Sequence, residues 1–143
     1  GSEGDPDEKI ARYTKILEEH PIDIVFLGIG ENGHIAFNDP HVADFNDPVR
    51  IKKVDLDLKC RQQQVNDGCF AKIEDVPEYA LTLTVPTMFS GKRLFCVVPA
   101  PSKADAVRAT VLGPVGEVCP ATVMRLHDNA ILYCDSDSGK YIL

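Results

Sequence analysis

The chain has 143 residues, of which 44% are hydrophobic and 26% charged, and 15 Lys and Arg against 22 Asp and Glu give a formal net charge of -7. A chain of this length can bury one core, which predicts a single globular domain or a large part of one. The acidic balance and the lack of a basic run argue against a nucleic-acid partner. No apolar run approaches the roughly 20 residues that span a bilayer. The N-terminus lacks the features of a signal peptide, so we expect no membrane partner and a cytoplasmic location.

The five cysteines carry no signature of a disulfide framework or a structural metal site. Their number is odd and no C-x-x-C pair occurs, a pattern that favours reduced thiols. Free cysteine commonly behaves as a small buried apolar residue. We therefore expect structural or incidental roles for all five, and we interpret Gly1-Ser2 as a remnant of cloning.

A helix followed by a strand is predicted at the start of the chain. Asp5-Pro6-Asp7-Glu8 supplies an N-cap, a first-turn proline and an acidic residue, and apolar residues follow at helical spacing up to Pro21. Residues 22–29 form a nearly continuous apolar run rich in β-branched side chains, typical of a strand buried on both faces of a parallel sheet. This succession predicts the α/β class, with an open, mostly parallel sheet and flanking helices.

Residues 28–48 are predicted to be a long loop system, because they carry three glycines and two Asn-Asp-Pro breaks. Loops of this length inside a compact domain tend to be functional. The remaining expected elements are an extended segment at 50–56, a short polar helix at 57–66, buried strands at 80–85 and 93–98, a helix from the capping box Ser102-Lys103-Ala104-Asp105 to Leu112, a short helix at 120–126 and a strand at 130–134.

The glycines at the start of the loop match the spacing of the dinucleotide-binding fingerprint, Gly28-Ile29-Gly30-Glu31-Asn32-Gly33. That fingerprint requires a helix to begin at once, so that its N-terminus holds the pyrophosphate. Pro40 and Pro48 interrupt any such helix. We therefore disfavour a nucleotide-binding domain, although a helix beginning at residues 30–33 would support one.

The same loop concentrates polar side chains beyond the carboxyl end of the predicted strand, where open α/β sheets bind their ligands. Within nine residues it carries Glu31, Asn32, His34, Asn38 and Asp39. A histidine flanked by carboxyl and carboxamide groups can be held in one tautomer and can shuttle a proton near neutral pH. The spacing alone fits equally a histidine that only satisfies loop amides.

Residues 27–40, Leu-Gly-Ile-Gly-Glu-Asn-Gly-His-Ile-Ala-Phe-Asn-Asp-Pro, resemble the signature of the glucosamine-6-phosphate deaminase family. The similarity continues through residues 80–85, the helix start at Lys103 and residues 130–135. It implies the Rossmann-like fold of these deaminases and of the related 6-phosphogluconolactonases. It also implies an enzyme that opens the pyranose ring of glucosamine 6-phosphate, moves a proton between C2 and C1, and releases ammonia to leave fructose 6-phosphate. That chemistry requires no metal and no cofactor.

The resemblance implies roles for individual residues: His34 as the ring-opening acid/base, Asn32 and Asp39 as its catalytic assistants, and Gly33, Lys103 and, as a weak candidate, Arg61 as substrate-binding residues. A lysine is electrostatically unexpected in the first turn of a helix, where an anion is favoured. The family commonly has Asp and Glu in place of Asn32 and Asp39. We therefore expect Asn32 to orient the imidazole without stabilising the imidazolium as a carboxylate would, and Asp39 to have a shorter reach.

The resemblance further implies that residues 1–143 form the C-terminal portion of one deaminase-like domain. The family places the base that removes the C2 proton in a preceding stretch with no counterpart here, so we expect no deamination by this chain alone. For the full-length parent it implies a sugar-phosphate substrate and a homo-oligomer. Two alternatives are kept: a non-catalytic sugar-phosphate-binding module, which Asn32 and Asp39 favour, and a 6-phosphogluconolactonase.

Overall fold

Helix α1, Pro6–Glu19, begins where the sequence predicts it in the computed structural model. The Asp5 carboxylate accepts a hydrogen bond from the Glu8 N–H at 3.0 Å, and Pro6 occupies the first turn. The structure describes residues 4–143, so the interpretation of Gly1-Ser2 as a cloning remnant lies outside the described residues. Within that range no helix is both long enough and apolar enough to cross a bilayer.

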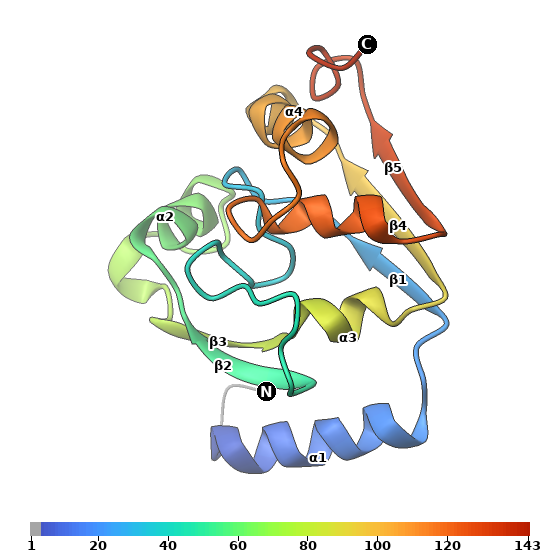
Figure 1. Ribbon diagram of the computed structural model, residues 1–143. Coiled ribbons are helices and arrows are strands. Elements are labelled where there is room, and N and C mark those ends of the chain that lie inside the picture. The colour runs from blue at the N-terminus through green and yellow to red at the C-terminus, as the bar shows by residue number, and fades with distance from the viewer. Residues whose placement is uncertain (1–3) are drawn as a thin grey trace.

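A three-stranded parallel sheet forms one layer of the fold, in the order β1 (Ile24–Leu27), β4 (Arg93–Val98) and β5 (Ala130–Cys134). Helices α3 (Val85–Phe89) and α4 (Ala104–Leu112) and the 3-10 helix η3 (Pro120–Leu126) pack on one side of it (Figure 1). Their side chains meet the sheet in the main core, which includes Met88, Leu94, Cys96, Val98, Val107, Ala121, Val123 and Met124. The predicted α/β fold with a parallel sheet and flanking helices is confirmed.

The prediction that strand β1 is buried on both faces is wrong. Its side chains alternate between exposed and partly buried: Ile24 is 51% exposed and Phe26 is 76% exposed. Phe26 stacks on Phe95 of the neighbouring strand, with 5.4 Å between the ring centroids. The apolar run has the composition of a strand covered on both sides, but among the described residues helices cover only one face of the sheet.

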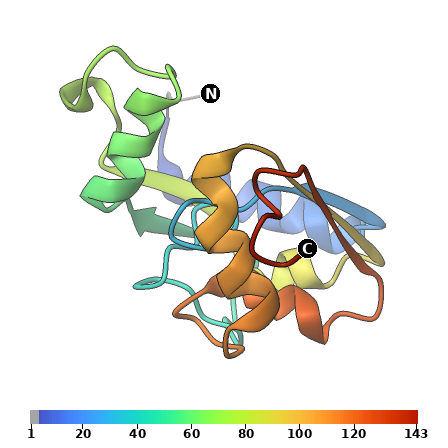
Figure 2. The ribbon, with the colours of Figure 1, turned by 90° about the horizontal axis from the view of Figure 1, so that it is seen from above.

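A second, two-stranded antiparallel sheet lies apart from the first and pairs β2 (Ile51–Asp55) with β3 (Tyr79–Leu83). Strand β2 and the following helix α2 (Leu58–Asn66) match the predicted extended segment and polar helix. The buried strand predicted at 80–85 is wrong in its extent and burial, because β3 ends at Leu83, is only partly buried and is followed directly by α3. Figure 2 shows α2 set apart from α4, with the loop that follows β1 lying between them.

The predicted capping box at the start of α4 does not form. Residues Pro101–Lys103 instead make a 3-10 turn, η2, that runs directly into α4. Lys103 occupies the N-cap position in a helical conformation and makes no side-chain capping bond. Because Ser102 lies inside the turn, its hydroxyl is not placed as an N-cap acceptor.

Candidate functional site

Three loops leave the same edge of the parallel sheet. Strands β1, β4 and β5 run in one direction, and Leu27 pairs with Cys96 while Val98 pairs with Cys134. The segments that follow the strands, 28–40, 99–103 and 135–138, therefore start side by side (Figure 1). This carboxyl edge is where open α/β sheets bind ligands.

The loop after β1 is a tight turn and not the start of a helix. The Gly30 N–H donates to the His34 carbonyl at 2.9 Å, and the Gly33 N–H donates to the Gly30 carbonyl at 2.9 Å. Gly33 has a φ of +83°, and a Cβ placed there would lie 2.5 Å from Sγ of Cys119. No helix begins at residues 30–33, so the geometry that would support a dinucleotide site is not present at this loop.

The far side of the loop is fixed to strand β3 by Asn38. This side chain is fully buried, and its Nδ2 donates to the carbonyls of Ile35 at 3.1 Å and Leu83 at 2.8 Å. The Phe37 N–H donates to Oγ1 of Thr82 at 3.1 Å. Asn38 is therefore an anchor for the loop, and it is not free to contact a substrate.

His34, Asn32 and Asp39 meet in one hydrogen-bonded triangle, as the sequence predicts. Nδ1 of His34 lies 2.7 Å from Oδ1 of Asn32 and 3.0 Å from Oδ1 of Asp39. Nδ2 of Asn32 donates to the same Asp39 oxygen at 2.8 Å. The His34 N–H also donates to Oδ1 of Asn32, at 3.1 Å.

The triangle determines which imidazole nitrogen carries the proton. The carboxylate of Asp39 only accepts, so the amide nitrogen of Asn32 must face it and the amide oxygen must face His34. Nδ1 of His34 then faces two acceptors and must hold a hydrogen. In the neutral ring Nε2 therefore has a free lone pair, and it has no hydrogen-bond partner among residues 4–143.

Asp39 is a buried, ionised carboxylate. Its side chain is 0% exposed, whereas that of His34 is 13% exposed. Burial by itself raises the pKa of Asp39, but hydrogen bonds from His34 and Asn32 and electrostatic interaction with His34 and His41 lower it below its ordinary value. The shorter reach expected for Asp39 does not prevent contact with the ring, because its Oδ1 lies 3.0 Å from Nδ1 of His34.

The backbone at Gly30 lies directly against the imidazole ring of His34. A Cβ at this position would lie 2.0 Å from Cε1 of His34, 2.3 Å from Nδ1 and 2.4 Å from Nε2. No side chain other than hydrogen fits there while the ring keeps its place. The sequence alone assigned no role to Gly30 beyond its place in the rejected nucleotide fingerprint and in the deaminase signature, although its short spacing to His34 is a signal of close approach.

Cys60, in the first turn of α2, is a neighbour of this triangle that sequence reasoning missed. It is buried, and its N–H donates to the N-cap carboxylate of Asp57 at 2.6 Å. Burial, followed by the negative charges of Asp39 and Asp57, raises the pKa of the Cys60 thiol to about 11. The thiol is therefore protonated at neutral pH. All five cysteines are free, as predicted.

Lys103 follows the neighbouring strand at the same edge of the sheet. It is partly buried, and its ammonium group makes no hydrogen bond or ion pair with another described residue. The preceding Ala100 has φ +85° and ψ 147°, a conformation that is almost confined to glycine. Its N–H donates to Oδ2 of Asp135 at 2.9 Å. The hydrogen bonds from Ser138, together with this bond from Ala100, lower the pKa of Asp135 to about 2.

The structure does not place Arg61 at the site. Its guanidinium donates to the carbonyls of Ile73 at 2.9 Å and Val76 at 3.0 Å. These bonds tie α2 to the 3-10 turn η1 (Ile73–Asp75) and the residue after it. The prediction of Arg61 as a substrate-binding residue is corrected accordingly, because both contacts hold the guanidinium within the protein.

Four cavities among residues 4–143 lie elsewhere. One of about 490 Å³ is lined by α1 and by segments 47–51 and 86–87, and it includes neither His34 nor Lys103. The candidate site is instead a surface of loops at the strand ends, with the imidazole partly accessible.

Comparisons with known proteins agree on one family. The family model described as glucosamine-6-phosphate isomerases/6-phosphogluconolactonase matches residues 1–133. The chain is 38% identical over 138 residues to glucosamine-6-phosphate deaminases from Bacillus thuringiensis (strain Al Hakam) and Bacillus anthracis (strain CDC 684 / NRRL 3495). The match covers 96% of this chain and 51% of each relative, so the chain spans about half the length of the curated relatives it matches.

Solved structures support the same assignment. A monomeric glucosamine-6-phosphate deaminase superposes with a TM-score of 0.89 and 33% identity, over 98% of this chain and 56% of that one. A 6-phosphogluconolactonase from Trypanosoma brucei superposes with a TM-score of 0.72 at 15% identity, over 99% of this chain and 57% of that one. The second similarity shows a shared fold.

Proposed function

Because the chain belongs to the family of glucosamine-6-phosphate isomerases and 6-phosphogluconolactonases, we propose that it provides the ring-opening site of a glucosamine-6-phosphate deaminase. The observation that carries the proposal is the triangle of His34, Asn32 and Asp39. It leaves Nε2 as the nitrogen that exchanges a proton with the sugar. Isomerisation with deamination to fructose 6-phosphate and ammonia is the activity proposed for the whole enzyme.

Ring opening moves one proton from the anomeric hydroxyl to the ring oxygen. Nε2 of neutral His34 accepts the proton of the O1 hydroxyl and then delivers it to O5 as the C1–O5 bond breaks. Between these two transfers the side chain of His34 is an imidazolium. The Asp39 carboxylate, 3.0 Å from Nδ1, stabilises its positive charge. Asn32 fixes the ring orientation but adds no charge.

We assign the phosphate end of the substrate to Lys103. The lysine has no described ion partner, and it lies where the 3-10 turn η2 passes into α4. Strand β4, which precedes it, is hydrogen-bonded to β1, which precedes the His34 loop. When the phosphate of the substrate binds Lys103, its sugar can lie along the same edge of the sheet toward His34. The backbone of the turn at Gly33 then lies beside the sugar.

The rate at which the α and β anomers of the substrate interconvert tests this function on the chain itself. Magnetisation-transfer NMR follows the interconversion of the α and β anomers of glucosamine 6-phosphate, which proceeds through the open-chain form. We expect the chain to raise the exchange rate above the buffer rate. Exchange at the buffer rate despite saturable binding would favour a non-catalytic sugar-phosphate-binding module. Hydrolysis of 6-phosphogluconolactone without anomer exchange would favour a lactonase.

A sugar phosphate is the small-molecule partner that the family supports, and we propose a cytoplasmic location. A homo-oligomer of the full-length parent also remains a proposal; the similar deaminase structure is of a monomeric enzyme.

A further inference from the structure

A cluster of three metal-binding side chains lies beside the catalytic triangle. A ring nitrogen of His34, a carboxylate oxygen of Asp39 and Sγ of Cys60 all lie within 4.8 Å of one another. His34 and Asp39 come from the loop after β1, and Cys60 comes from the first turn of α2. The fold brings together residues whose sequence spacing matches no metal-binding motif.

An unsatisfied buried oxygen points independently to a ligand at this cluster. Oδ1 of Asp39 is bonded by Asn32 and His34, but Oδ2 is buried without a well-formed hydrogen bond among the described residues, and the thiol of Cys60, a weak donor, interacts with this carboxylate. The whole side chain is 0% exposed. A buried carboxylate oxygen without a partner is destabilising, and coordination to a cation satisfies it.

We propose that His34, Asp39 and Cys60 bind one divalent metal ion of the zinc class. Nitrogen, carboxylate oxygen and thiolate are the ligands that zinc takes, at about 2.0–2.3 Å, so two ligands of one ion lie at most about 4.6 Å apart. The ligand atoms of the cluster lie within 4.8 Å of one another, close to this limit. The sulfur and nitrogen ligands disfavour Mg²⁺ and Ca²⁺.

The charge and proton balance of the site is simple. As the bond between Cys60 Sγ and the metal forms, the thiol proton leaves to solvent. The carboxylate of Asp39 and the thiolate of Cys60 then carry two negative charges, which neutralise the ion. The neutral imidazole keeps one proton, on the nitrogen that does not ligate.

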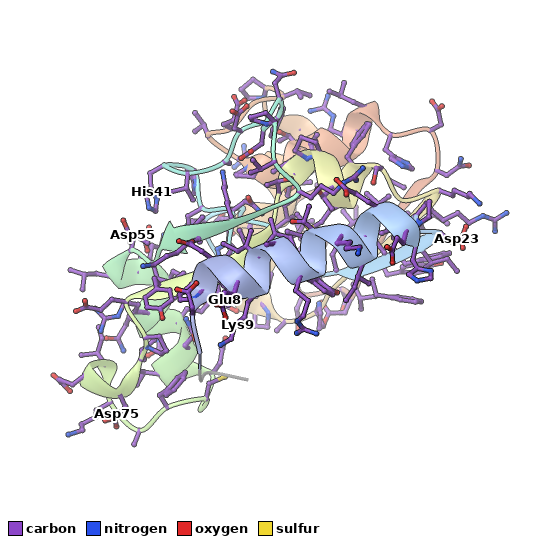
Figure 3. All side chains as sticks on the ribbon, turned by 90° about the horizontal axis from the view of Figure 1, so that it is seen from below. Glu8, Lys9, Asp23, His41, Asp55 and Asp75 are labelled. Atoms are coloured by element: carbon purple, nitrogen blue, oxygen red, sulfur yellow. The ribbon has the colours of Figure 1, made fainter. Side chains whose placement is uncertain are left out.

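A second group of ligand-type residues connects this cluster to the surface. Asp39, His41 and Asp57 also have one ligand atom each within 4.8 Å of the others. His41 is exposed and projects at the outer edge of the molecule, on the same side as Asp55 (Figure 3). If the proposed function holds, a bound ion ties up His34 and inhibits ring opening reversibly.

Cobalt titration tests the site without reference to activity. The reduced protein is first freed of metal with a chelator and then titrated with Co²⁺, a spectroscopic substitute for zinc. We expect one equivalent to bind, with a thiolate-to-cobalt absorption band. Cys60→Ser should lose the band and at least tenfold in affinity. The matched control Cys69→Ser, which changes an exposed cysteine three residues beyond α2, should keep both.

X-ray absorption provides a test that needs no variant and is unaffected if Cys60→Ser fails to fold. In the zinc-loaded unmodified protein we expect one sulfur ligand at about 2.3 Å together with nitrogen and oxygen ligands. A shell with no sulfur or with several sulfurs would overturn the proposal, as would an unchanged cobalt band in folded Cys60→Ser. Either failure leaves the anomer-exchange test of the proposed function untouched.

Discussion

The imidazole of His34 rests directly on Gly30, with only 2.0 Å between Cε1 and the position that a Cβ at residue 30 would occupy. The ring is thus held from below by backbone and from the side by Asn32 and Asp39. The orientation of the proton-transfer group depends on a residue that itself carries no functional group.

Gly30→Ala should therefore damage ring opening with little effect on phosphate binding. The added methyl group must displace the imidazole, and misplacing a catalytic group by about 1 Å can cost roughly 10²-fold in rate. Anomer-exchange NMR measures the rate, and calorimetry measures the affinity for glucosamine 6-phosphate. Gly116→Ala is the control, because a Cβ there meets no atom within 4 Å. Equal rates in the two variants would contradict the assigned role of Gly30.

Lys103→Ala should weaken substrate binding. Removal of one charge-assisted contact to the phosphate should cost about 1.5–3 kcal/mol of binding free energy, seen as a raised dissociation constant for glucosamine 6-phosphate. Once the substrate is saturating, the exchange rate should be nearly unchanged. Lys92→Ala is a matched control, because Lys92 pairs with Asp23 and precedes β4 at the opposite edge of the sheet. Equal affinities in the two variants would remove Lys103 from the phosphate site.

Because of Asp39, the free energy of unfolding should fall as the pH is lowered into the acid range. Because the pKa of Asp39 is lower in the folded state than its ordinary value of 3.8, its ionised form contributes stability at pH values above the unfolded pKa. That contribution is lost as the pH falls through the folded pKa. Asp39→Asn should be less stable than the unmodified chain by about 1–3 kcal/mol at pH 7, and the gap should narrow on acidification. Urea unfolding at pH 7, 5 and 3.5 measures it; a constant gap would contradict the argument.

Ala100→Gly should stabilise the chain. Ala100 has a φ of +85° in a region that is almost confined to glycine, and such strain costs on the order of 1–3 kcal/mol. The hydrogen bond to Asp135 holds it there. The same change inside helix α4, Ala109→Gly, should instead destabilise by about 1 kcal/mol. Thermal unfolding of both variants gives the signs, and a lower melting temperature for Ala100→Gly would refute the assignment of strain.

The parts of the site that sequence reasoning anticipated are local in the chain. His34, Asn32 and Asp39 lie within one loop, so their meeting follows from short spacing and from the strand that precedes them. Cys60 approaches the same triangle only because α2 packs against the loop, a tertiary contact that spacing does not encode. The partner of strand β3 was likewise not predictable, because alternation within a strand does not say which strand pairs with it.

Replacing His34 by glutamine tests whether the imidazole of His34 moves the proton that opens the sugar ring. His34→Gln keeps a polar side chain over Gly30 but cannot accept and return a proton. We predict that it lowers the rate of anomer exchange at saturating glucosamine 6-phosphate by about 10²–10⁴-fold, the usual contribution of a general acid/base, while the dissociation constant changes little. An unchanged saturating exchange rate with weakened binding would make His34 a binding residue and would contradict the account.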